Sequence, residues 1–250
     1  MQYYSLKEIV SSLPAKKNSN SSLWVKLIVR KVSFVFTYLF INMGCSAWGA
    51  SVISVLVALA GSFCFAVDRA VFRIIGVCLI ELWLVLDCVD GNIARVKKTS
   101  SEMGEFIDAL SGYYVTGFVY FFVGIAAYYT TDIFRHYAFI LIVFGGISAI
   151  AGLLARIIHQ KYTYSILVMN QINPMRHNKI PEASVQNKKS LQYIRSRMDK
   201  EIGISGLFMP FLIVALIFNL FDLFTIFYCG FQCCGLITVT VYYAFKAKHE

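Results

Sequence analysis

Charged residues are scarce in this chain. Asp, Glu, Lys and Arg make up 15% of its 250 residues, whereas soluble domains average about 25%. Hydrophobic residues make up 58%, so the composition indicates an integral membrane protein and excludes an ordinary soluble domain. The N-terminal stretch MQYYSLKEIVSSLPAKKNSNSS also lacks the continuous apolar core of a secretory signal peptide. We therefore expect the first spanning helix to serve as the membrane anchor.

Motifs for zinc and for nucleic acids are missing as well. The seven cysteines form no pair of CxxC motifs, and the spacing of Cys229, Cys233 and Cys234 does not suit zinc. We expect them to be reduced thiols. The net charge is +9, but the basic residues flank apolar runs and do not form one patch. This pattern indicates cytoplasmic membrane flanks and no nucleic-acid partner.

Six apolar runs each approach the ~20 residues needed to cross the hydrocarbon layer. They cover residues 46–67, 71–93, 106–130, 136–158, 202–220 and 222–245. The predicted fold class is therefore an all-α integral membrane protein with six transmembrane helices and both termini on one side. Of the 23 Lys and Arg residues, only Arg69, Arg73 and Arg135 fall in the loops of the other side. The side that carries the termini is therefore predicted to be cytoplasmic.

Residues 24–42, before the first span, are apolar except for one polar stripe. Lys26, Arg30, Ser33 and Thr37 recur at the period of a helix face. Because basic side chains are costly inside a bilayer, we predict an amphipathic helix that lies in the cytoplasmic interface.

The chain divides into three segments under this interpretation. A polar N-terminal segment covers residues 1–23, the interfacial helix covers 24–42, and a six-helix membrane domain covers 46–245. The membrane domain includes a basic cytoplasmic loop at 159–200. We expect this loop to be attracted to anionic lipid headgroups; a substrate-gating role is the alternative.

The most informative stretch joins the second and third apolar runs and reads DCVDGNIARVKKTSSEMGEFID over residues 87–108. On a helix, Asp87 and Asp90 are one turn apart, and Asp108 begins the next helix of an antiparallel pair. Three carboxylates at one depth, with no His or Cys among them, suit Mg2+, Mn2+ or Ca2+ better than zinc. Such ions can grip a diphosphate, and Arg95 could add a fixed cation.

The spacing D-x2-D-G-x2-A-R-x8-G-x3-D resembles the motif of the CDP-alcohol phosphotransferases, also called CDP-alcohol phosphatidyltransferases. The resemblance implies an enzyme that transfers a substituted phosphate from a CDP-alcohol to the hydroxyl of a second alcohol and releases CMP. It places the reaction in phospholipid or related lipid or glycan biosynthesis. It also implies two Mg2+ or Mn2+ ions, whose ligands would be Asp87, Asp90 and Asp108. The cytidine diphosphate pocket would be shaped by Gly91, Ala94, Arg95 and Gly104.

One position departs from the family pattern. The motif ends with a fourth aspartate four residues after the third, and this chain has Gly112 there. In the family that aspartate binds metal and activates the acceptor hydroxyl, so the catalytic base is left unassigned. Water, the donor phosphate, Tyr113, His159 and Glu81 are the candidate proton acceptors.

The motif bears on three candidate functions. An active transferase is favoured by the motif. A degenerate member that binds nucleotide or lipid without turnover is the alternative suggested by Gly112. An ion-coupled transporter is disfavoured, because the acids gather at one boundary and do not mark a path across the membrane. Arg156 and Lys161, near the end of the fourth span, are interpreted as anchors on the cytoplasmic side, with contact to an acceptor phosphate as the alternative.

The resemblance also implies partners and a location. The partners are a CDP-alcohol donor, an alcohol or lipid acceptor, membrane lipids and a second copy of the chain in a homodimer. The location is a multi-pass protein of a bacterial inner membrane, with both termini and the active site in the cytoplasm.

Overall fold

The computed structural model describes residues 3–14, 18, 21–172, 202–204 and 206–249. These residues form helices and connections and contain no strand, so the predicted all-α class is confirmed. In chain order the helical elements are α1 (Leu6–Ser11), the π-helical turn η1 (Val25–Val29), α3 (Arg30–Asn42), α4 (Ala47–Cys64), α5 (Ala70–Val96), α6 (Glu102–Thr130), the 3-10 turn η2 (Arg135–Tyr137), α7 (Phe139–Ile172), α9 (Phe208–Phe218) and α10 (Phe221–His249).

Four helical stretches are long and apolar enough to cross a membrane. They are Ala47–Cys64 in α4, Phe106–Thr130 in α6, Phe139–Ile166 in α7 and Phe221–Ala247 in α10. Large apolar side chains such as Leu56, Ile150 and Ile237 are exposed on these helices, as expected where a helix faces lipid and not water. The chain is therefore an integral membrane protein.

The two other predicted spans differ from these four. α5 has 27 residues, or about 40 Å, but it carries Arg73, Glu81, Asp87 and Asp90. α9 has 11 residues, about 16 Å, which is short of the ~30 Å hydrocarbon core. α9 ends at Asn219, whose φ of 57° is left-handed and stops the helix. The count of six spans therefore stays a prediction at α5 and α9.

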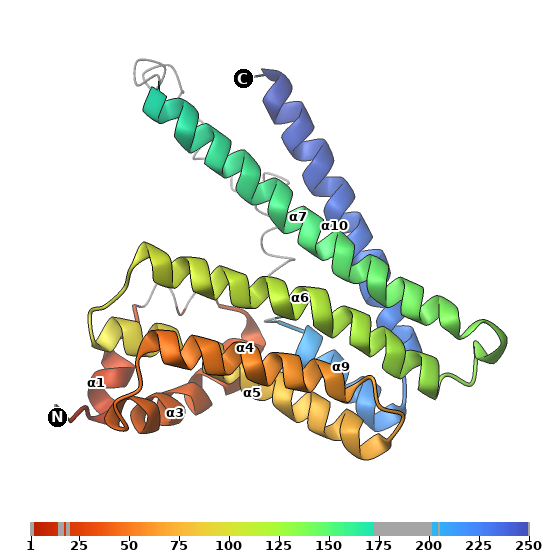
Figure 1. Ribbon diagram of the computed structural model, residues 1–250, viewed down its shortest axis with the longest axis horizontal. Coiled ribbons are helices and arrows are strands. Elements are labelled where there is room, and N and C mark those ends of the chain that lie inside the picture. The colour runs from red at the N-terminus through yellow and green to blue at the C-terminus, as the bar shows by residue number, and fades with distance from the viewer. Residues whose placement is uncertain (1–2, 15–17, 19–20, 173–201, 205, 250) are drawn as a thin grey trace.

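The helices fall into two groups in space. α4, α5 and α6 lie side by side, and the pair α7 and α10 crosses this group and runs out beyond it (Figure 1). In Figure 1, α1 and the α5–α6 connection lie at the left and the end of α10 lies at the top, whereas the α4–α5, α6–α7 and α9–α10 connections lie at the right. The first and last described helices thus end away from these three connections.

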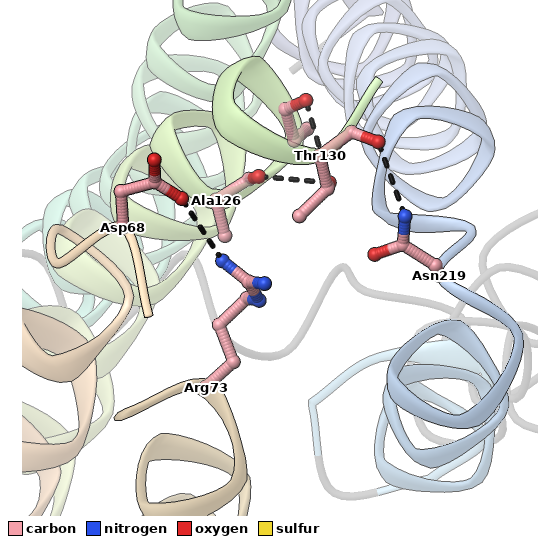
Figure 2. A network of polar contacts seen from close by, with 6 residues as sticks. Asp68, Arg73, Ala126, Thr130 and Asn219 are labelled. Carbon is pink, nitrogen blue, oxygen red and sulfur yellow. Dashed lines mark hydrogen bonds and ion pairs between the residues drawn. The ribbon is translucent and has the colours of Figure 1, made fainter. Parts of the chain in front are cut away.

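Polar contacts connect the helices near the α4–α5 and α9–α10 connections. Figure 2 shows the Asn219 side-chain amide, which donates to the Thr130 carbonyl oxygen at 3.1 Å. The same view contains the ion pair between Asp68 and Arg73, at 3.5 Å. The Thr131 hydroxyl donates to buried Asp222 at 2.9 Å. The bonds of Asn219 and Asp222 tie the end of α6 to the α9–α10 turn, and the ion pair links the α4–α5 connection to α5.

α6 and α7 approach each other closely at Gly124 and Gly145. A Cβ added to Gly124 would lie 2.7 Å from the Leu141 carbonyl oxygen, and one added to Gly145 would lie 2.7 Å from the Tyr120 carbonyl oxygen. Because the atoms met are backbone atoms, they cannot rotate away. Small residues at a helix crossing are a common basis of packing in membranes, and here they set how close α6 and α7 lie.

The helix predicted over residues 24–42 is present as η1 and α3, but its polar stripe does not face water. Arg30, Ser33 and Thr37 are buried, and the Asn92 amide of α5 donates to Ser33 at 3.3 Å and to Thr37 at 3.0 Å. Apolar side chains on the other faces, Val35 among them, are exposed. Periodicity finds a stripe but cannot tell whether solvent or protein covers it. An interfacial placement of this helix stays a prediction.

The predicted loop at 159–200 begins later than expected. α7 continues as a helix through Ile172, because the polar residues from His159 onward are compatible with a helix that extends beyond the apolar layer. Residues 173–201 lie outside the described residues, so the rest of the predicted loop is not assessed.

Candidate functional site

A cavity of about 330 Å³ lies where α7 and α10 meet α5 and α6. Its lining comes from all four helices and from the segment before α9. The lining residues are Trp83, Leu84, Asp87, Asp108, Ala109, Gly112, Thr116, Tyr120, Gly152, Ala155, Arg156, Gly203, Ile204, Phe231, Gln232 and Gly235. The cavity thus contains the first and last carboxylates of the motif.

Asp87 and Asp108 reach this cavity from two different helices. Asp87 lies near the end of α5 and Asp108 lies near the start of α6, where the chain has just turned back. The Ser101 hydroxyl caps α6 by accepting from the Gly104 N–H at 3.1 Å, which fixes where the helix begins. α5 and α6 each pack on α4 and not closely on each other, yet Asp87 and Asp108 line the same cavity.

Asp90 is turned away from the cavity. Its carboxylate is 7% exposed and accepts from the Ser51 hydroxyl of α4 and from the Gly91 N–H. Residues three apart on an α-helix point about 60° apart, and here that offset directs Asp90 to α4. The convergence of all three carboxylates is therefore not what the structure shows.

The other motif residues do not line the cavity either. The Arg95 guanidinium donates to Asn92, so it lies beside the polar stripe of α3. Gly91 is adjacent to Asp90, and the Ala94 carbonyl oxygen accepts from Thr99 in the turn that ends α5. Gly104 contributes its N–H to the cap of α6. Their predicted role in a cytidine diphosphate pocket stays a prediction.

Gly112 faces an arginine from the neighbouring span. A Cβ added to Gly112 would lie 2.8 Å from Nη1 of Arg156 on α7. The guanidinium therefore occupies the space into which an aspartate side chain at this position would extend. Arg156 has no hydrogen bond or ion pair to another described residue. It lines the cavity with Asp87 and Asp108, and its predicted role as an anchor stays a prediction.

Three polar side chains continue the cavity beyond Gly112. The Thr116 hydroxyl donates to the Gly112 carbonyl oxygen at 2.7 Å, and the Gln232 amide donates to the Tyr120 hydroxyl at 2.8 Å. Sequence reasoning missed these residues. The available signal was Gln232, a polar residue in the otherwise apolar run of α10.

The three side chains that were candidates for the catalytic base lie outside the described lining of the cavity. Glu81 accepts from the Trp24 indole N–H at 3.2 Å, and His159 contacts the Tyr243 hydroxyl. The buried Tyr113 hydroxyl has no hydrogen-bond partner among the residues that the structure describes. None of the three is among the described residues that line the cavity.

The cavity suits a hard divalent cation that is shared with a substrate. Mg2+ is usually held by one or two carboxylates together with substrate phosphates, and Asp87 and Asp108 supply two carboxylates with no His or Cys beside them. Within the described ranges, no three His, Cys, Asp or Glu side chains gather closely enough to hold a metal by themselves. The donor set fits Mg2+ or Mn2+ bound with a diphosphate.

The fold and the cavity define a helical membrane protein with an acidic site between its spans. The family model for CDP-alcohol phosphatidyltransferase matches residues 28–182, which include Asp87, Asp108 and Arg156. The chain belongs to this family, and the resemblance seen in the motif is confirmed. The family consists of membrane transferases of phospholipid biosynthesis, and its members generally depend on divalent metal. No curated protein matches the chain significantly.

Proposed function

We propose that the chain transfers a substituted phosphate group from a CDP-alcohol to the hydroxyl of a second alcohol, with Mg2+ or Mn2+ as cofactor. The observation that carries this proposal is the cavity in which Asp87 and Asp108, from two helices, lie with the Arg156 guanidinium. Family membership supplies the reaction type. The arrangement supplies groups of both charges that a diphosphate and its metal require.

The bond changes follow from the substrates. The acceptor oxygen forms a bond to the phosphorus that carries the donor alcohol, and the bond from that phosphorus to the CMP oxygen breaks. CMP leaves with the electron pair, and the acceptor proton passes to water or to the donor phosphate. Asp87 and Asp108 would hold the divalent ion, which neutralises charge on the phosphate oxygens when bound. Asp90, the third carboxylate of the motif, would support Asp87 from its bonds to α4.

The decisive experiment is an assay of CMP release by the full chain in lipid nanodiscs. A panel of CDP-alcohols, each with small polar alcohols and lipids as acceptors, is incubated with Mg2+ or Mn2+. We expect CMP and the new phosphodiester in equal amounts from at least one pair, and none after chelation of the metal. Folded protein that releases no CMP from any donor would contradict the proposal.

A second candidate is a family member that binds a nucleotide or lipid without turnover. It is favoured by Gly112 and by the lack of a replacement base among the described residues of the cavity. Titration calorimetry with CDP separates the two functions. Under this candidate, CDP binds in the presence of metal while the assay of CMP release stays negative.

The topology and assembly are also proposals. We place both termini and the cavity on the cytoplasmic side, because twenty of the 23 Lys and Arg residues fall on the side of the termini in the six-span arrangement. A homodimer is proposed because members of the family commonly pair.

A further inference from the structure

Gly112 and Arg156 form a matched pair across the α6–α7 contact. At Gly112 the absence of a side chain leaves a space, and the end of the Arg156 side chain fills it, 2.8 Å from where a Cβ would stand. A carboxylate that would bind a cation has been replaced by a group that is itself a cation. The two positions are far apart in sequence, so the match arises from the packing of α7 on α6.

The charge of the cavity follows from this replacement. Among the described lining residues, Asp87 and Asp108 carry two negative charges and Arg156 carries one positive charge. The net formal charge of these three groups is minus one. With one divalent ion bound, this lining would carry a net charge of plus one, which attracts a diphosphate. A guanidinium that bonds to no other side chain in the described part of the chain is also a natural ligand for a phosphate oxygen.

We propose that Arg156 takes the place of a second metal ion, so that the site binds one divalent cation on Asp87 and Asp108, and the guanidinium contacts the donor diphosphate directly. This inference rests on the proposed function and specifies how the diphosphate is held. Arg156 is thus a substrate-binding residue and not a membrane anchor. Gly112 is the residue that leaves room for it.

The test is a count of bound Mn2+ in the presence of CDP. Free Mn2+ is measured by electron paramagnetic resonance while it is added to the full chain in nanodiscs with saturating CDP. We expect one Mn2+ per chain for the unaltered protein. A count of two would overturn the inference, and a count of zero would overturn it together with the metal-dependent reaction.

Variants at Gly112 and Arg156 distinguish the contribution of each residue to the number of bound ions. Gly112→Asp alone should still bind one Mn2+, because the new carboxylate pairs with Arg156. Gly112→Asp combined with Arg156→Ala frees that carboxylate, and the count should rise to two. If the double variant binds one Mn2+ while its thermal unfolding is unchanged, or if Gly112→Asp alone already binds two, the inference is wrong.

Affinity for CDP gives an independent readout. Arg156→Ala should weaken CDP binding on the order of 10-fold or more while the Mn2+ count stays at one, since a hydrogen bond to a charged group is lost. Arg156→Lys, which keeps the charge, should recover part of the affinity. Unchanged CDP binding in Arg156→Ala contradicts the inference even when CMP release is normal. Loss of CMP release with these binding results intact counts against the proposed reaction only.

Discussion

At the scale of single residues, the two cavity carboxylates can be tested by exchange of one oxygen for nitrogen. Asp87→Asn and Asp108→Asn keep the side-chain shape but remove the charge that a divalent ion needs. We expect CMP release to fall by about 100-fold or more, because metal stabilisation of the transition state contributes several kcal/mol. The measurements are CMP release and Mn2+ affinity in nanodiscs. Asp132→Asn is the matched control, since Asp132 is exposed in the α6–α7 connection, and it should behave as the unaltered chain.

Asp90 gives the sharper comparison. The motif predicts it as a metal ligand, whereas the structure engages its oxygens with Ser51 and Gly91. Under the structural arrangement, Asp90→Asn lowers Mn2+ affinity less than Asp87→Asn does. Equal losses in the two variants would show that Asp90 turns into the cavity when the ion binds.

Sequence spacing predicted part of this site. It singled out Asp87 and Asp108, and both line one cavity; their role as metal ligands stays a prediction. It did not predict that Asp90 would point to α4, since the direction of a side chain three residues further along depends on the neighbouring helix. The sequence also offered no reason to connect Gly112 with Arg156. Only the packing of α7 on α6 shows that one fills the space of the other.

At the scale of the elements, the close contact of α6 and α7 is open to a direct test. Gly145→Ala would bring a Cβ to 2.7 Å from the Tyr120 carbonyl oxygen. Because backbone must shift, we expect a loss of about 1–3 kcal/mol in the free energy of unfolding. The measurement is thermal unfolding in detergent, which should occur at a lower temperature.

Gly230→Ala is the control for that variant. Gly230 lies on α10, and an added Cβ would meet no atom within 4 Å. Both changes raise helix propensity to a similar degree, so their difference reports on the close contact alone. If Gly145→Ala is as stable as Gly230→Ala, then α6 and α7 do not approach this closely.

The elements themselves were predicted unevenly from the sequence. Apolar runs located α4, α6, α7 and α10 well, because hydrophobic length is a strong signal. The run at 202–220 gave only α9, which starts at Phe208 and ends at Asn219. The polar stripe of α3 was found, but the partner that buries it, Asn92, lies 55 and 59 positions away from Thr37 and Ser33. The helical period of the polar residues predicts a stripe but does not identify a partner so far away in the sequence.

At the scale of the whole molecule, both chain ends should be on one side of the membrane. α1 and the end of α10 both lie away from the α4–α5, α6–α7 and α9–α10 connections (Figure 1), as expected if the chain crosses the membrane an even number of times. We expect protease-sensitive tags at the N-terminus and the C-terminus to be cleaved together in inside-out vesicles and protected together in right-side-out vesicles. A tag in the α6–α7 connection, near His136, is the control and should give the reverse pattern. Tags at the two termini that differ from each other would contradict the arrangement.

We expect α7 to pivot on α6 at their glycine contact, because the two backbones lie closest there. Arg156 lies eleven residues beyond Gly145 on α7, a lever arm of about 16 Å. A tilt of ~5° about Gly124 and Gly145 would move the guanidinium by roughly 1.4 Å relative to α6, which is half of a hydrogen-bond length. A change in the tilt of α7 within the bilayer would thus change the width of the cavity that Asp87, Asp108 and Arg156 line. The thickness of the membrane would then influence how tightly a diphosphate is gripped, without any change in the residues that touch it.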